Sequence, residues 1–199
     1  MSLPWLNSAL AQGLALRSHA LLVQGPEGVG QYELGTALAR GWLCEKSDGR
    51  SPACGECPSC RLMAAGTHPD FQLLVPEALR ESLGLSSDEA EGEPKASKAK
   101  PSREIKVDAV RAMLSFAQGS SARGRAKVVL IYPAEALNTV AANALLKTLE
   151  EPAGLLRFVL ASAAPQDLLP TIRSRCQPLD LGLPDAATCL AWLAEQGVE

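Results

Sequence analysis

Residues 20–32 read ALLVQGPEGVGQY, and this stretch decides the fold that the sequence predicts. The continuous apolar run at 20–23 indicates a short buried strand, and the glycines and proline after it indicate a tight turn. A strand, a glycine-rich turn and a helix start together form the context of a phosphate-binding loop, G-x-x-x-x-G-K-[ST]. Taken alone, the same residues also fit a plain glycine-rich turn between a strand and a helix.

The two positions of this loop that carry its chemistry hold other residues. Gly25 and Gly30 would let backbone N–H groups converge on a phosphate at the helix N-terminus. The lysine position, however, holds Gln31, which brings no positive charge. The Ser/Thr position holds Tyr32, which is too bulky to ligate Mg²⁺ as a small hydroxyl does. The sequence therefore predicts a degenerate phosphate loop.

A working phosphate loop also needs an acidic residue at the end of a neighbouring strand. The apolar run at 128–131 is followed by Tyr132 and Pro133, and Glu135 lies too far along to be expected in that place. Because the cation, the metal-binding hydroxyl and the carboxylate are all missing, we expect no ATP hydrolysis by the chain itself. We expect Tyr32 and Tyr132 to fill the space that a nucleotide would occupy.

The rest of the chain alternates strand and helix patterns. Continuous apolar runs at 128–131 and 158–161 indicate two more strands that are covered on both faces. Apolar residues at helical spacing predict helices over 34–43, 107–117 and 139–150. Strands that alternate with helices predict an α/β fold with a parallel sheet flanked by helices.

Composition excludes several classes of protein. The chain has 199 residues, of which 47% are hydrophobic and 21% charged, and its net charge is −3. Collagen-like and wholly disordered chains do not have this composition. The slight acidic excess argues against autonomous nucleic-acid binding, which usually needs a strongly basic surface. No run of about 18 apolar residues and no signal peptide is visible, so we expect a cytoplasmic protein with no membrane partner.

The cysteines predict a metal site. Four of the six follow the spacing C-x9-C-x2-C-x2-C, which can close a tetrahedral Zn²⁺ site. The predicted ligands are Cys44, Cys54, Cys57 and Cys60. A structural zinc is expected, within a zinc-binding module over 44–68. An iron–sulfur cluster is the rival because C-x2-C-x2-C also opens a ferredoxin motif, and free or redox-active thiols are a further alternative.

Two segments interrupt the α/β pattern. Residues 77–104 are rich in Ser, Glu, Lys and Ala and predict a flexible insertion, because they bury too little apolar surface to offset their ordering entropy. A domain over 1–178 is expected to give way at 179–199 to the start of a second, helical domain, with a helix at 188–195. We expect the chain to be a fragment that ends inside that domain.

Arg175 stands in the segment PTIRSRC at 170–176, soon after the third strand. By default such an arginine is solvated or salt-bridged. Beside a phosphate-loop ATPase, an arginine supplied by a neighbouring subunit can also stabilise charge on the transferring phosphoryl group. Arg173 is a weaker candidate for the same role.

Several motifs carry a resemblance to a known family. They are the cysteine set, AGTHPD at 65–70, NALLKTLEEP at 143–152 and SRC at 174–176. Together they resemble the bacterial DNA polymerase III clamp-loader family, within the AAA+ ATPases, over nearly the whole chain except the insertion. The resemblance implies an AAA+ RecA-like fold with an inserted zinc-binding module and the start of a small helical lid domain.

The resemblance also implies a role. The altered phosphate loop and the missing acidic residue are similar to those of the non-hydrolysing subunit of that family. The motor subunits, gamma and tau, keep both the loop and the acidic residue. Such a subunit joins gamma/tau and the delta subunit in a hetero-pentameric ring that loads the sliding clamp onto primed DNA. Arg175 would then be an arginine finger for a neighbouring ATPase subunit, and a missing third domain would form the collar of the ring. The alternatives are an ATP-binding motor of the same family or a zinc-dependent DNA-binding module.

Overall fold

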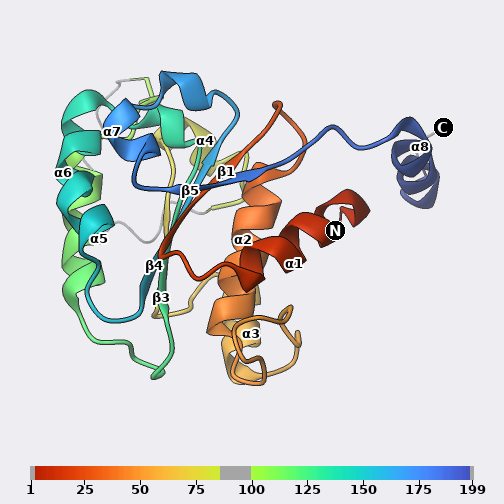
Figure 1. The fold of residues 1–199 in the computed structure, drawn as a ribbon, viewed down its shortest axis with the longest axis horizontal. Coiled ribbons are helices and arrows are strands. Elements are labelled where there is room, and N and C mark those ends of the chain that lie inside the picture. Colours follow the sequence, from red (N-terminus) through yellow and green to blue (C-terminus); the bar gives the residue numbers. More distant parts are fainter. Residues whose placement is uncertain (1–2, 86–99, 198–199) are drawn as a thin grey trace.

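Five parallel strands form one sheet, in the order β2-β3-β4-β1-β5. The computed structural model describes residues 3–85 and 100–197. The strands are β1 (Ala20–Gln24), β2 (Phe71–Leu74), β3 (Lys127–Ile131), β4 (Leu156–Ser162) and β5 (Gln177–Asp180). All their pairings are parallel. Helices cover both faces of this sheet (Figure 1), which confirms the predicted α/β class.

The three predicted strands are the three central strands. β1, β3 and β4 are buried along almost their whole length, which is why their sequences are continuously apolar rather than alternating. In register, Ala20 of β1 lies beside Phe158 of β4, and Lys127 of β3 lies beside Leu156.

The helices divide between the two faces of the sheet (Figure 1). On one face lie α1 (Asn7–Ala15), α2 (Gln31–Leu43) and α3 (Pro58–Ala64), and on the other lie α5 (Val107–Gln118), α6 (Thr139–Glu150) and α7 (Pro170–Arg173). Successive residues of the strands point to opposite faces of the sheet and pack into two separate hydrophobic cores. Leu130 and Val159 face the α2 side, whereas Val129 and Phe158 face α5 and α6. The helices predicted over 34–43, 107–117 and 139–150 are thereby confirmed, with small differences at their ends.

Five further helices lie in the described residues. They are the 3₁₀ helices η1 (Pro4–Leu6), η3 (Ala134–Ala136) and η4 (Pro165–Asp167), and the α-helices α4 (Glu77–Arg80) and α8 (Ala186–Glu195). The side chain of Asp185 caps α8 by accepting from the Thr188 backbone N–H at 2.9 Å. Within residues 3–85 and 100–197, no helix has the length and apolar character needed to span a membrane.

The sheet continues past the domain boundary drawn at residue 178. β5 runs to Asp180, and the Leu181 N–H still donates to the Gln24 carbonyl at 2.7 Å. The predicted insertion at 77–104 lies in part outside the described residues, at 86–99. Its two described ends meet, because the Ala78 N–H donates to the Ser102 carbonyl at 3.0 Å.

Candidate functional site

The phosphate loop has the backbone that its glycines predict. It connects β1 to α2, with Gly28 at φ +83° and Gly30 at φ +105°. Side-chain-bearing residues rarely adopt such angles, which explains the need for glycine at both positions. The Leu34 N–H donates to the Gly30 carbonyl at 2.9 Å, so the first turn of α2 begins directly at the loop.

Gln31 closes the loop upon itself. Its Nε2 donates to the carbonyls of Gly25 at 2.8 Å and of Pro26 at 2.6 Å, and the residue is only 3% exposed. An amide nitrogen has two protons to donate, and both are used here. The side chain at the lysine position is therefore neutral, and its two amide protons are hydrogen-bonded to carbonyls of the loop.

The two tyrosines lie against one another beside the loop. The ring centroids of Tyr32 and Tyr132 are 5.3 Å apart, with 44° between the ring planes. Burial raises the pKa of both phenols, so both are neutral at pH 7. The structure thus brings together the residues that replace the metal-binding hydroxyl and the strand-end carboxylate.

Glu135 does not take the place of that carboxylate. Its Oε1 accepts the backbone N–H groups of Ala163 at 3.1 Å and Ala164 at 3.2 Å. The side chain therefore supports the segment that directly follows β4.

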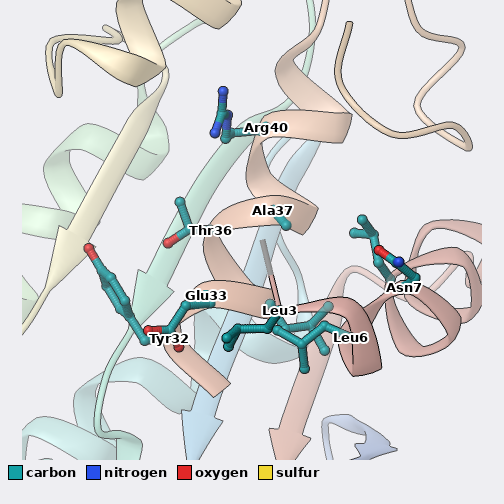
Figure 2. A pocket seen from close by; sticks show the side chains of 10 residues that line it. Leu3, Leu6, Asn7, Tyr32, Glu33, Thr36, Ala37 and Arg40 are labelled. Atoms are coloured by element: carbon teal, nitrogen blue, oxygen red, sulfur yellow. The ribbon is translucent and has the colours of Figure 1, made fainter. Parts of the chain in front are cut away.

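The N-terminal segment also covers the loop, which sequence reasoning missed. The indole Nε1 of Trp5 donates to the Val29 carbonyl at 2.9 Å. A Cβ at Gly30 would lie 2.7 Å from Leu3 Cδ1 and 2.9 Å from Leu6 Cδ1, so these two leucine side chains pack against the bare glycine and would have to shift to admit a larger residue. Figure 2 shows Leu3 and Leu6 beside the first turns of α2, where they line a pocket of about 300 Å³. No local signal marked this contact, because it joins residues 24 positions apart.

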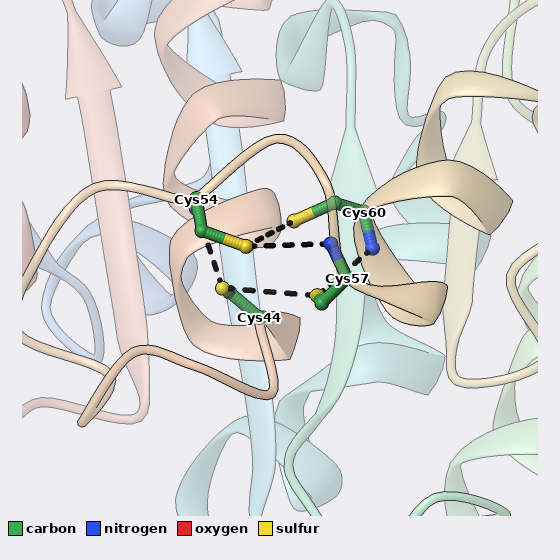
Figure 3. Close-up of side chains that lie close together, drawn as sticks. All are labelled: Cys44, Cys54, Cys57 and Cys60. Carbon is green, nitrogen blue, oxygen red and sulfur yellow. Dashed lines mark hydrogen bonds between the residues drawn. The ribbon is translucent and has the colours of Figure 1, made fainter.

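The four predicted metal ligands come together. Their sulfur atoms all lie within 4.8 Å of one another and point inward (Figure 3). The Sγ atoms of Cys44 and Cys57 are 3.9 Å apart, and so are those of Cys54 and Cys60. A tetrahedral Zn²⁺ with bonds of ~2.3 Å requires sulfur separations of ~3.8 Å. The donor set therefore fits such an ion, and two of its six sulfur separations already match the required distance.

Backbone N–H groups point at the sulfurs. Cys54, Cys57 and Cys60 donate to the Sγ atoms of Cys44, Cys54 and Cys57 in turn, each at 3.4 Å. Although burial opposes ionisation, hydrogen bonds from the Cys60 N–H and other neighbours lower the pKa of the Cys57 thiol to about 6, whereas burial raises the pKa of the Cys60 thiol to about 12. Thiolates are the form that binds a metal. Cys176 and Cys189 lie outside the cluster, as expected.

The cysteine module is tied to the sheet by polar contacts. Arg123, before β3, donates through Nε to Glu45 Oε1 at 2.8 Å and to Ser59 Oγ at 3.0 Å. Asp70 accepts the backbone N–H groups of Ala122 at 2.7 Å and Arg123 at 3.0 Å. His68 is buried beside them and accepts the Asp70 N–H on Nδ1 at 3.1 Å, but it is not part of the metal cluster.

Arg175 is paired with a residue of α6. Its guanidinium donates to Glu150 through Nε at 2.6 Å and also through Nη2, and it donates through Nη1 to the Thr171 carbonyl at 2.8 Å. About a third of the side chain, 31%, remains exposed. Arg175 is thus held in one orientation at the surface, two residues after Arg173, the last residue of α7.

Comparisons with known proteins agree in their result. A family model described as "DNA polymerase III, delta subunit" matches residues 4–184. The chain is 44% identical over 193 residues to DNA polymerase III subunit delta' of Pseudomonas aeruginosa, covering 96% of this chain and 52% of that protein. For subunit delta' of Escherichia coli, the identity is 39% over 178 residues, covering 89% and 46%. The chain therefore spans about half the length of these relatives.

A solved structure shows a similar fold. It is a DNA polymerase III gamma subunit-related protein from Thermotoga maritima, with a TM-score of 0.57 and 21% identity. The match covers 91% of this chain and 47% of that one. From the family match and the named relatives, the chain belongs to the family of DNA polymerase III delta' subunits.

Proposed function

We propose that the chain is part of a non-hydrolysing subunit of the bacterial DNA polymerase III clamp loader. One observation carries this proposal. The buried amide of Gln31 bonds the carbonyls of Gly25 and Pro26, in the loop where a motor subunit needs a lysine for the phosphates. Because such a subunit would not hydrolyse ATP itself, its contribution to an ATP-driven complex would be made through its contacts with other subunits.

Arg175 is the residue through which the chain would act on a neighbour. A planar, permanently charged guanidinium is suited to stabilise charge on a transferring phosphoryl group. Glu150 and the Thr171 carbonyl fix the direction of this side chain while leaving part of it exposed. This support is consistent with an arginine finger in trans, and Arg173 is the second candidate.

The proposed partners follow from the family. They are the gamma/tau motor subunits and the delta subunit in a hetero-pentameric ring, with the sliding clamp and primed DNA reached through the complex, in the cytoplasm. The AAA+ domain, expected from the sequence over 1–178, would extend through β5 to Leu181, and the helical lid would begin after it. In the structure, α8 touches the rest of the chain near η1, where the rings of Trp5 and Trp192 meet edge to face at 5.6 Å.

A structural zinc is the proposed cofactor. The four sulfurs offer a closed ligand set, so such an ion would have no open position for substrate and would serve the fold. Its place is the module of 44–68, which the Glu45–Arg123 contact ties to the segment before β3.

Equilibrium titration with Mg²⁺ and ATP tests the proposal. We expect no saturable binding by the purified protein at concentrations that saturate a gamma/tau subunit measured in parallel. Magnesium-dependent binding with micromolar affinity would reject the non-hydrolysing role. It would instead favour a motor subunit, an alternative suggested by 37% identity over 171 residues to DNA polymerase III subunit tau of Escherichia coli.

A further inference from the structure

A second cavity, of about 280 Å³, lies at the other end of the sheet from the phosphate loop. It opens where β3 and β4 begin, next to the cysteine module. Its lining residues are Trp42, Asp48, Gly49, Gly124, Arg125, Ala126, Leu155 and Arg157. Leu155 is 69% exposed, so solvent reaches the cavity. We call it the arginine cavity.

Arg157 enters this cavity without an anionic partner. It belongs to β4 and lies over the ring of Trp42, with Cζ 4.7 Å from the ring centroid. Its Nη1 is buried and has no hydrogen-bond partner among the described residues. Burial lowers the pKa of this guanidinium, and no carboxylate opposes the effect. Arg157 is half-buried, and among the described residues the contact recorded for its guanidinium is the aromatic face of Trp42, so the cation keeps the capacity to bind an anion.

The other charges around the cavity also favour an anion. Arg125 uses Nη2 to donate to the Ser47 carbonyl, and it forms no ion pair within the described residues. Asp48 is the one acidic residue of the lining, and its Oδ1 is engaged by the Arg50 N–H at 2.8 Å and by Ser51 Oγ at 3.3 Å. Two guanidinium groups therefore face one carboxylate that is already bonded elsewhere.

We propose that the arginine cavity is an oxyanion site that binds a phosphate group, either free or as a phosphate monoester, through Arg157 and Arg125. Guanidinium groups suit phosphate because their N–H groups match its oxygens in pairs. The site is separate from the phosphate loop, which sits at the opposite ends of the strands, and it does not depend on the proposed function.

Calorimetric titration with inorganic phosphate, in chloride buffer at constant ionic strength, tests this site. We expect one saturable site per chain, weakened roughly tenfold to a hundredfold by Arg157→Gln, because hydrogen bonds to a charged group are lost. Arg103→Gln is the matched control, because Arg103 is exposed and has no ion pair within the described residues. It should bind phosphate as the unaltered protein does.

Further variants keep the result interpretable. Asp48→Asn should tighten binding, because it removes the negative charge from the lining and keeps an acceptor for the Arg50 N–H. If Arg157→Gln fails to fold, Arg157→Lys preserves the charge and should still weaken binding through loss of the paired N–H groups.

Ribose 5-phosphate, with ribose as the phosphate-free control, separates a phosphate monoester from the free ion. Binding of either phosphate compound that Arg157→Gln weakens supports the site. The proposal is overturned if Arg157→Gln and the unaltered protein bind equally. It is also overturned if neither compound binds saturably below about 10 mM, an affinity too weak to matter.

Discussion

At the scale of single residues, the glutamine at position 31 replaces the lysine of a working phosphate loop and removes its positive charge. Lysine and glutamine are both long and polar, but only lysine carries the charge that a bound triphosphate needs. Here the amide nitrogen of Gln31 donates hydrogen bonds to the carbonyls of Gly25 and Pro26. The loop thus keeps the backbone shape of a phosphate loop, while two of its carbonyl groups accept hydrogen bonds from Gln31.

Gln31→Ala should destabilise the protein. The change removes two buried hydrogen bonds, each worth about 0.5–1.5 kcal/mol, so the free energy of unfolding should fall by about 1–3 kcal/mol. Urea denaturation measures this difference. Gln12→Ala is the control, because Gln12 is an exposed residue of α1, and it should change stability little. Equal effects of the two variants would contradict the closure of the loop by Gln31.

His68 should make stability depend on pH. Burial lowers the pKa of its imidazole, so the unfolded chain takes up a proton near the ordinary value of about 6.5 while the folded chain stays neutral. Stability should therefore fall as the pH drops below about 6.5 toward the folded-state pKa. His68→Asn keeps an acceptor for the Asp70 N–H and should flatten this fall. Denaturation of both proteins at several pH values, with zinc at saturation, provides the comparison, and parallel curves would exclude His68.

At the scale of elements, capping explains where α6 begins. Asn138 precedes the helix, and its Oδ1 accepts the Ala141 N–H at 2.9 Å. Asn138→Ala should cost about 0.5–2 kcal/mol of stability, the usual effect of losing such a cap. Asn143→Ala, in the exposed middle of the same helix, should be neutral or slightly stabilising because alanine is the better helix former. Thermal or urea denaturation of the pair checks this, and a reversed order would be evidence against the cap.

The cysteine module should hold one zinc ion per chain by elemental analysis. A metal that binds only the folded state at a thousandfold excess over its Kd adds about 4 kcal/mol, so chelation should lower the melting temperature markedly. Cys57→Ser should lose the metal, whereas Cys189→Ser, outside the cluster, should retain it. Iron in place of zinc would instead support the ferredoxin-like alternative.

The sequence predicted the buried central strands of the sheet better than the strands at its two edges. β1, β3 and β4 are covered on both faces, so their residues must be apolar throughout and the pattern is clear. β2 and β5 lie at the edges of the sheet, are four residues long and contain polar residues or, at Pro178, a proline that an edge strand tolerates. Neither therefore gave a signal strong enough to predict a strand.

The same contrast holds for the sites. The cysteine cluster could be predicted because three of its ligands are within seven residues of one another and the thiol chemistry is specific. The sequence also indicated what the phosphate loop lacks. It could not indicate what covers the loop, because the Trp5–Val29 bond depends on how the N-terminal segment returns to the sheet. Likewise, Arg157 meets Trp42 only through the packing of β4 against α2.

At the scale of the whole molecule, the N-terminal segment around Trp5 links the closed loop to α8. Trp5 bonds the loop at Val29, and its ring touches Trp192 of α8. The closed loop is therefore connected to α8, whereas Arg175 is bonded to Glu150, the last residue of α6. Helix α6 lies on the opposite face of the sheet from α2 (Figure 1). Under the proposed function, the closed loop would hold a fixed shape, and the separate surface around Arg175 would contact a neighbouring subunit.

Arg175→Ala in the full-length protein, assembled with its proposed partners, tests that second surface. An arginine finger contributes about 10³-fold or more to phosphoryl transfer at the one site that it serves, so clamp-stimulated ATP hydrolysis by the complex should drop. Assembly should be preserved, because the pair with Glu150 is a partly exposed ion pair of the kind that contributes at most about 1 kcal/mol to stability. Arg173→Ala, two residues away at the end of α7, tests the second candidate in the same assay, and Arg111→Ala, an exposed arginine of α5, is the control. Turnover that stays unchanged in Arg175→Ala at saturating clamp and DNA would remove Arg175 from the mechanism, and a loss confined to Arg173→Ala would transfer the role to that residue.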